Sequence, residues 1–210
     1  MEQKKKGSKI KALIFDVGGV LRLGNPSFDH PKVYRSIAKK LRVSLDQYFD
    51  AIDTFYVKSY IGKISEKKAL QLMSKNLKTT PERLRKLYIS NYRKYYVLNK
   101  KLIEFAFKKK KQGYKIAILS DQWWLSKEAL VPRYFYTKFN PTIVSCEVGV
   151  RKPNPKIYRL MLKKLRLPAK QTVFIDNQKW NIPPAKKLGM KTVLFKNNKQ
   201  AIREINKLLK

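Results

Sequence analysis

Short apolar runs alternate with helical patterns along the second half of the chain. Four runs have the length and composition of buried strands: residues 115–119, 141–145, 172–175 and 191–195. Apolar positions at helical spacing predict four helices: residues 101–111, 154–165, 184–188 and 199–209. Because strands that alternate with helices form parallel sheets covered on both faces, the pattern predicts an α/β fold with a layered core.

The first part of the chain has a different pattern. An apolar run at residues 10–15 predicts one more buried strand, which ends at Asp16 and precedes the glycines of a tight turn. The stretch that follows shows only helical periodicity. We therefore expect a helical insertion at residues 25–96 within a core formed by residues 1–24 and 97–210.

Polar side chains stand at the ends of three predicted strands. Asp16 follows the first, Ser120 and Asp121 follow the second, and Asp176 and Asn177 follow a later one. Each of them alone could cap the next helix. Ligands bind beyond the carboxyl ends of parallel strands, so together these side chains predict one ligand site.

The single Cys and the single His limit the chemistry of that site. They provide neither an internal disulfide nor the ligands of a zinc ribbon or zinc finger, so any metal must bind to oxygen atoms. We expect His30 to be a solvated loop residue, which leaves no Cys-His or Ser-His catalytic pair. We expect Cys146 to be a small buried residue.

Length and hydropathy favour a folded cytoplasmic protein. The 210 residues suit one large domain or a core with a modest insertion, and 43% of them are hydrophobic, which is enough to build a core. The chain has no apolar run of about 18 residues and no secretory signal in residues 1–9. We expect no membrane partner, and the sequence does not indicate an oligomeric state.

The chain is strongly basic, with 49 Lys and Arg against 14 Asp and Glu and a net charge of +35. Such a field attracts polyanions and steers small anions. We find no helix-turn-helix, zinc-finger or RRM signature, and Lys108–Lys111 complement the C-terminal dipole of a predicted helix. The charge therefore favours non-specific attraction to nucleic acid over a dedicated nucleic-acid site.

Four segments resemble, in order, the four motifs of the haloacid dehalogenase-like (HAD) superfamily. They are residues 12–21, 116–121, 147–158 and 173–182. The resemblance covers residues 10–195, and it implies a Rossmann-like three-layer core with an α-helical cap inserted after the first strand. It also implies a hydrolase in which Asp16 is the nucleophile and Lys152 is the conserved-type lysine of the third motif.

The residues themselves support phosphate chemistry. A carboxylate attacks a phosphate dianion only where cations neutralise the phosphoryl oxygens, and Lys152 supplies one such charge. Ser120, Asp121 and the turn at Gly18 and Gly19 complete the expected substrate site, since the hydroxyl and the turn N–H groups can donate to phosphate.

Mg²⁺ is the cofactor that the resemblance implies. We expect it on Asp16, the Gly18 carbonyl, Asp176 and Asn177, and its oxygen preference fits this set. The first chemical step would form an aspartyl-phosphate on Asp16, and water would hydrolyse it in the second.

Two positions depart from the family pattern. Gly18 replaces the second Asp that usually protonates the leaving group, and Asn177 replaces the acid that often binds the metal. Three interpretations stay open. The chain is a slow phosphatase of a small phosphorylated metabolite, a metal-independent dehalogenase, or a binding protein on the same scaffold that is attracted to nucleic acid.

Aromatic residues add two expectations. Trp123 and Trp124 are adjacent, so we expect one of them in the core and the other to reach the pocket or the cap. A tyrosine-rich stretch has the spacing of one helical face, and we expect it to form the packed core of the cap rather than a stacking platform for bases. Its members are Tyr88, Tyr92, Tyr95 and Tyr96.

Overall fold

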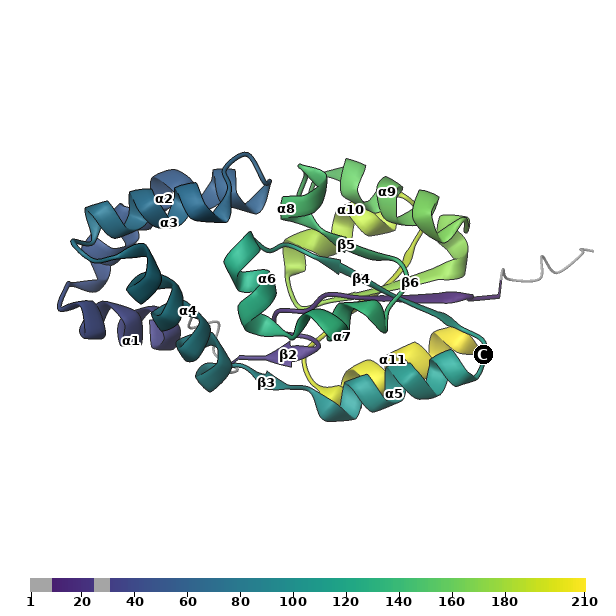
Figure 1. Cartoon of the computed structure of the whole chain (residues 1–210). Coiled ribbons are helices and arrows are strands. Elements are labelled where there is room, and N and C mark those ends of the chain that lie inside the picture. Colours follow the sequence, from purple (N-terminus) through teal and green to yellow (C-terminus); the bar gives the residue numbers. More distant parts are fainter. Residues whose placement is uncertain (1–8, 25–30) are drawn as a thin grey trace, which may run out of the picture.

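A five-stranded parallel sheet forms the centre of the molecule. The computed structural model describes residues 9–24 and 31–210. The sheet has the order β5-β4-β1-β6-β7, and the α/β fold class is confirmed (Figure 1). Its strands are β1 (Ala12–Phe15), β4 (Lys115–Ser120), β5 (Thr142–Val144), β6 (Thr172–Asp176) and β7 (Lys191–Leu194). Because β1 pairs with both β4 and β6, the ends of these three strands lie side by side.

Helices cover both faces of the sheet. Alternation along β1 sends Leu13 and Phe15 into one buried cluster and Ala12 and Ile14 into another. The first cluster packs under α5 (Lys100–Lys111) and α11 (Asn198–Leu209). The second packs under α9 (Pro155–Leu165) and α10 (Ile182–Lys187), on the opposite face of the sheet (Figure 1).

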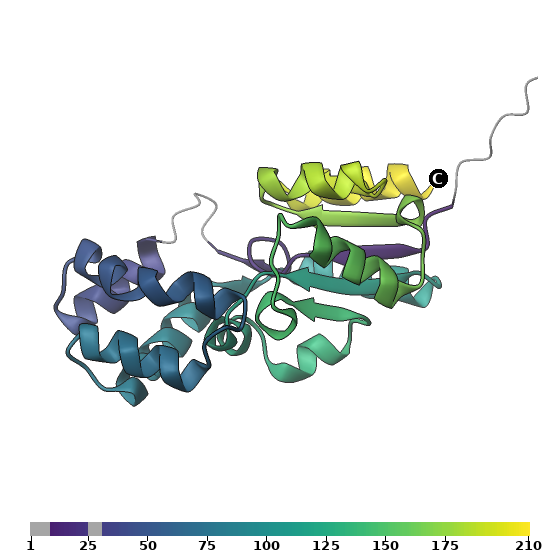
Figure 2. The ribbon, with the colours of Figure 1, turned by 90° about the horizontal axis from the view of Figure 1, so that it is seen from above.

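Four helices form the cap, which lies beside the core (Figure 2). They are α1 (Pro31–Leu41), α2 (Leu45–Tyr60), α3 (Glu66–Asn76) and α4 (Pro81–Tyr95). The hydroxyls of Ser44, Ser65 and Thr80 accept hydrogen bonds from backbone N–H groups in the first turns of α2, α3 and α4, respectively. A ribbon of two short antiparallel strands, β2 (Arg22–Leu23) and β3 (Val97–Leu98), connects the cap to the core. The sequence did not predict these strands, since two residues carry no periodicity.

Short helices follow two strands of the sheet, and the first and last of them contact the cap. They are α6 (Trp124–Leu130), α7 (Arg133–Thr137) and α8 (Ser145–Val148), with two 3₁₀ turns further on, η1 (Ala169–Gln171) and η2 (Lys179–Asn181). Trp123 is buried and packs edge-to-face on Tyr88 of α4, with ring centroids 5.4 Å apart. Trp124 is half-buried. One tryptophan therefore does reach the cap from a buried position, and Cys146 is buried as expected.

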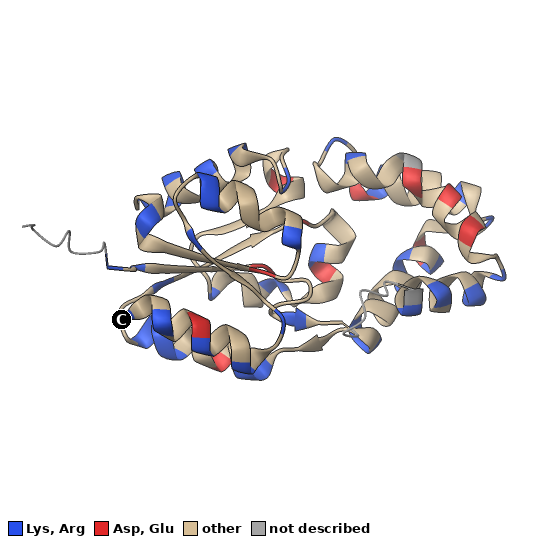
Figure 3. Cartoon of the chain, turned by 180° about the vertical axis from the view of Figure 1, so that it is seen from behind, with Lys and Arg blue, Asp and Glu red and all other residues tan. Residues whose placement is uncertain are grey.

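Basic residues are spread over core and cap alike (Figure 3). Outside the site, the ion pairs among the described residues join Arg85 to Glu66 and Glu128, and Lys127 to Glu147. No helix within residues 9–24 and 31–210 is long and apolar enough to cross a bilayer. The expectations for His30 and for residues 1–8 concern parts of the chain outside the described residues.

Candidate active site

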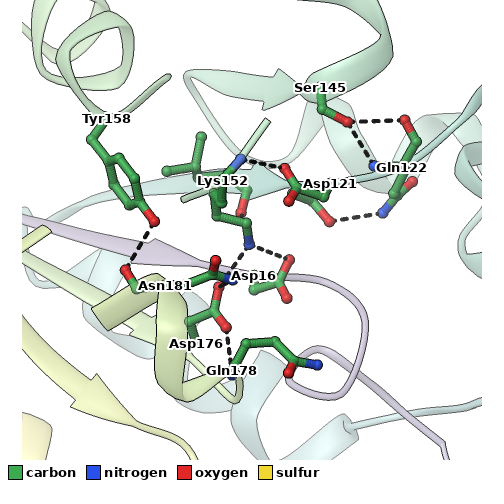
Figure 4. Close-up of polar contacts among 11 residues, drawn as sticks. Asp16, Asp121, Gln122, Ser145, Lys152, Tyr158, Asp176, Gln178 and Asn181 are labelled. Atoms are coloured by element: carbon green, nitrogen blue, oxygen red, sulfur yellow. Dashed lines mark hydrogen bonds and ion pairs between the residues drawn. The ribbon is translucent and has the colours of Figure 1, made fainter. Parts of the chain in front are cut away.

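Three neighbouring strands deliver polar side chains to one edge of the sheet. Asp16 follows β1, Ser120 ends β4 and Asp176 ends β6, as the strand-end argument predicted. Figure 4 shows Asp16 and Asp176 close together around Lys152. The backbone N–H of Asp16 donates to the carbonyl of Ile175 at 2.9 Å, so the position of Asp16 is fixed by the sheet itself.

Lys152 lies between the two buried carboxylates. Its Nζ is 2.6 Å from Asp176 Oδ2 and 3.1 Å from Asp16 Oδ1 (Figure 4). It also donates to the Leu119 carbonyl at 3.2 Å. The residue is only 2% exposed. Burial alone would lower the pKa of Lys152, but the surrounding carboxylates raise it above its ordinary value. Lys152 is therefore a fixed positive charge.

Burial raises the pKa of Asp16 to about 7. The positive charge of Lys152 and a hydrogen bond from Ser120 act against this shift, while the charge of Asp176 adds to it. Asp16 lines the large cavity described below. Its carboxyl group thus combines access to a ligand with a poorly solvated surrounding, as carboxylates at functional sites often do.

Asp176 is held by three donors. Lys152 and Asn181 Nδ2 both donate to Oδ2, the latter at 3.0 Å, and the Gln178 backbone N–H donates to Oδ1 at 2.7 Å. Asp176 is fully buried and is not among the residues that line the cavity. It therefore faces Lys152 and the protein interior, and it orients the lysine.

Asp121 and Ser120 are also fixed by hydrogen bonds with neighbouring residues. Asp121 Oδ1 accepts the Lys152 backbone N–H at 3.0 Å, which fixes the loop that carries the lysine. Ser120 Oγ accepts a hydrogen bond from Gln122 Nε2 at 3.0 Å. The Oε1 atom of Gln122 in turn accepts a hydrogen bond from the Tyr136 hydroxyl at 2.8 Å. Tyr136 was not singled out from the sequence, because its contact with Gln122 depends on how α7 packs.

Tyr158 is a second residue that sequence reasoning missed. Its hydroxyl donates to the Asn181 carbonyl at 2.9 Å from inside α9 (Figure 4). A signal was available, since a tyrosine in an apolar helix stripe needs a partner for its hydroxyl. The bond ties the fourth motif-like segment to the helix that follows Lys152.

The turn after Asp16 brings Gly19 against Asn177. A Cβ at position 19 would lie 2.2 Å from Asn177 Nδ2, and Gly19 has a φ of +82°, so both contact and conformation require glycine there. The Gly19 N–H donates to the Arg22 carbonyl at 2.7 Å. This donor therefore serves the turn instead of the expected phosphate.

Side-chain oxygens beside this turn could hold a cation. The buried oxygens Asn177 Oδ1, Gln178 Oε1 and Asn181 Oδ1 have no hydrogen-bond partner in the described part of the chain. In the same part, no group of three or more His, Cys, Asp and Glu side chains is placed to hold a metal ion. These oxygens are ligands of the kind that Mg²⁺ prefers, but such a site would have fewer charged ligands than one built from carboxylates alone.

Gly18 faces open space. A Cβ built there meets no atom of the described residues within 4 Å, and its φ lies outside the left-handed range. Gly18 lines the same cavity as Asp16. The site consequently has room for the missing acid but does not contain it.

A cavity of about 990 Å³ extends from Asp16 to the cap. Tyr56, Tyr60, Tyr92, Tyr95 and Tyr96 form much of its cap side. Tyr88 and Tyr92 are buried in the cap, as expected for a packed core, and Tyr92 also lines the cavity beside the half-buried Tyr95 and Tyr96. The tyrosine stretch thus has two roles, because α4 ends at the boundary between cap and core.

Known proteins resemble this chain in sequence. A family model described as haloacid dehalogenase-like hydrolase matches residues 10–189. Bifunctional epoxide hydrolase 2 from Sus scrofa is 32% identical over 116 residues, which are 53% of this chain and 21% of that protein. Glyceraldehyde 3-phosphate phosphatase from Pyrococcus furiosus is 33% identical over 98 residues, 44% of this chain and 39% of that protein. The chain thus matches about a fifth of the epoxide hydrolase.

Solved structures resemble it over most of its length. A HAD family enzyme from Bacteroides thetaiotaomicron has a TM-score of 0.73 at 21% identity and covers 89% of this chain and 93% of its own. The same enzyme in complex with magnesium and inorganic phosphate has a TM-score of 0.72 at 20% identity, with 88% and 93% covered. At this identity the likeness shows the fold.

Proposed function

This chain belongs to the haloacid dehalogenase-like hydrolase family, and we propose that it acts within that family as a Mg²⁺-dependent phosphatase of small phosphorylated metabolites. One observation carries the proposal: Asp16 lines a large cavity while its carboxylate pairs with the buried cation of Lys152. The related phosphatases and the fold shared with an enzyme that binds magnesium and phosphate support it.

Asp16 is the nucleophile in this proposal. A carboxylate oxygen forms a bond to phosphorus while the bond from phosphorus to the ester oxygen breaks, and the electron pair leaves with the alcohol oxygen. A water molecule then attacks the aspartyl-phosphate, which releases phosphate and regenerates the carboxylate of Asp16.

Fixed charge and hydrogen bonds make this attack possible. Lys152 offsets the repulsion between the carboxylate and the phosphate dianion, and the Ser120 hydroxyl is placed to donate to a phosphoryl oxygen. Asp176 and Asp121 act on Lys152, the first through its ammonium group and the second through its backbone. These groups are positioned before substrate binds, so little reorganisation accompanies the reaction.

Mg²⁺ would be held by the Asp16 carboxylate, the Gly18 carbonyl and the Asn177 amide oxygen, with Asp176 behind them. Bound there, it would supply further positive charge to the phosphoryl oxygens. The orphaned Asn177 oxygen is the feature that favours such a site. One neutral ligand in place of a carboxylate predicts weaker binding than in a site with two acids.

The empty space at Gly18 favours a second candidate, a metal-independent dehalogenase. A halide departs as an anion and needs no proton, so that reaction has no use for an acid at this position. The same Asp16 carboxylate would displace the halide from carbon, and water would hydrolyse the ester that forms.

A panel of phosphate esters and 2-haloacids, with Mg²⁺ or with chelator, tests both candidates. We expect phosphate release that requires Mg²⁺ and is abolished in Asp16→Asn, whereas Asp50→Asn on the exposed face of α2 keeps it. Halide release in chelator would support the dehalogenase instead. Phosphate release by a folded Asp16→Asn protein at the native rate would refute the covalent mechanism.

A further inference from the structure

We propose that the ester hydrolysed at this site is an aryl phosphate, in which the phosphate is bonded to the hydroxyl oxygen of an aromatic ring. The inference rests on the proposed phosphatase function and names its substrate class. Two independent features support it: the wall of the cavity and the missing acid at Gly18.

The wall of the cavity is aromatic. Five of the twelve tyrosines in the chain line it from the cap side, and Trp180 lines it from the core. Trp180 is 60% exposed, so its ring is accessible to a ligand in the cavity. A volume of about 990 Å³ lies at the upper end of ligand pockets and far exceeds the needs of a phosphate group.

The hydroxyls of three of the cavity-lining tyrosines are engaged in pairs within the cap. Tyr56 donates its hydroxyl to Tyr60 at 2.8 Å, and the hydroxyls of Tyr92 and Tyr34 are 3.1 Å apart. The rings of Tyr92 and Tyr96 stack with centroids 5.4 Å apart and planes at 9°. Hydroxyls that bond to one another are less available to a sugar or polyol, whereas ring faces and edges suit a planar group.

The lack of a proton-donating acid at position 18 limits which leaving groups the site can release. When the bond to phosphorus breaks, the electron pair stays on the ester oxygen, which must receive a proton or leave as an anion. A phenol has a pKa of about 10, so phenolate can leave as the anion and take its proton from water afterwards. An alkoxide resembles hydroxide, whose parent acid water has a pKa of about 15.7, and it requires a proton donor.

Asp121 is the other carboxyl group on the cavity wall among the described residues. Its Oδ1 accepts the backbone N–H of Lys152, so the structure gives it a positioning role in the loop of that lysine. Gly18, two residues after the nucleophile, has open space where a donor would stand. The site as built thus lacks a dedicated donor and favours esters that do not need one.

Three probes separate the two features. Phenyl phosphate has a ring and a phenolate leaving group, benzyl phosphate has a ring and an alkoxide, and glycerol phosphate has an alkoxide and no ring. We expect kcat/KM for phenyl phosphate to exceed that for benzyl phosphate about 100-fold or more, because no acid assists the alkoxide. We expect benzyl phosphate to exceed glycerol phosphate about three- to tenfold, mainly through KM.

Variants test whether the missing acid causes the preference for phenyl over benzyl phosphate, and whether the aromatic wall causes the preference for benzyl over glycerol phosphate. Gly18→Asp should reduce the ratio of phenyl to benzyl phosphate. Tyr56→Leu and Trp180→Leu should raise KM for both ring-bearing probes about three- to tenfold and leave glycerol phosphate unaffected. Tyr134→Leu is the matched control, since Tyr134 is 65% exposed and lies outside the cavity lining.

The outcomes distinguish this inference from the function on which it rests. Equal hydrolysis of the three probes overturns the aryl phosphate assignment and leaves the phosphatase intact. A ratio of phenyl to benzyl phosphate that rises in Asp121→Asn also overturns it, because Asp121 would then be the donor. If a folded protein releases phosphate from none of the three probes, the proposed function falls, and the inference with it.

Discussion

The core site and the cap both bury polar groups, but they satisfy them differently. In the core, Lys152 balances the carboxylates of Asp16 and Asp176, so each member depends on the charge of the others. In the cap, neutral hydroxyls pair with one another, as Tyr48 does by donating to Tyr88. A buried charge left alone is far more costly than a buried hydroxyl left alone. The two regions should therefore respond very differently to the loss of one member.

Loss of Lys152 should have the largest effect. Lys152→Met leaves two buried carboxylates without their cation, and we expect the free energy of unfolding to fall by about 3 to 5 kcal/mol at pH 7. Phosphatase activity should be lost. Urea unfolding measures the change, and Lys156→Met, at an exposed lysine of α9, should have little effect. A fully stable Lys152→Met protein would show that the charges are not coupled.

Titration of Asp16 should make stability depend on pH. Its pKa is about 7 in the folded protein against an ordinary value of 3.8, so the folded state binds more protons than the unfolded state between these values. Stability should therefore fall as pH rises from about 4 to about 7, by roughly 3 kcal/mol. The difference between native and Asp16→Asn unfolding curves in chelator isolates this contribution. A difference that does not change with pH would contradict it.

An acid at position 18 should allow the site to hydrolyse esters whose leaving group is an alkoxide. Gly18→Asp enters open space, and we expect release of phosphate from benzyl phosphate to rise about 10- to 100-fold. Gly18→Asn has the same shape without the proton and serves as the control. Equal rates in the two variants would mean that the proton donor is not what the native site lacks.

Asn177→Asp should strengthen the metal site. A carboxylate oxygen in place of an amide oxygen should lower the Mg²⁺ concentration for half-maximal activity about tenfold. Asn154→Asp, at the N-cap of α9, changes charge by the same amount away from the turn and should leave the Mg²⁺ dependence unchanged. An unaltered Mg²⁺ dependence in Asn177→Asp would exclude Asn177 as a ligand.

The cap should tolerate the loss of one hydroxyl. Burial raises the pKa of Tyr48 and Tyr88 well above ordinary values, so both stay neutral, and Tyr48→Phe removes one neutral bond. We expect a loss of about 1 kcal/mol in the free energy of unfolding, independent of pH below 9. Loss of several kcal/mol would show that the cap network is as tightly coupled as the core site.

The same contrast explains what the sequence could predict. The apolar runs predict the strands of the sheet, and the rule that parallel strand ends converge predicts that Asp16, Ser120 and Asp176 lie together. The position of Lys152 followed from the family resemblance, since a loop residue has no periodicity to reveal it. These features depend on short segments and on general rules of topology.

Contacts between distant helices were beyond the sequence. The pairing of Tyr48 with Tyr88 joins residues of α2 and α4, and the approach of Gly19 to Asn177 joins a turn after β1 to the end of β6. The spacing of the tyrosines indicated a face but not which hydroxyl meets which. Such contacts depend on how whole elements pack, and a single sequence does not encode that in any local pattern.

Gly18 has a consequence at the level of codons. Two of the four glycine codons become aspartate codons through a single base change at the second position. The Cβ of that aspartate would meet no atom of the described residues within 4 Å. In a population that uses either codon, mutation repeatedly presents selection with the acid-bearing variant. Under the proposed function, a change from acid-independent to acid-assisted hydrolysis would therefore need one mutational step.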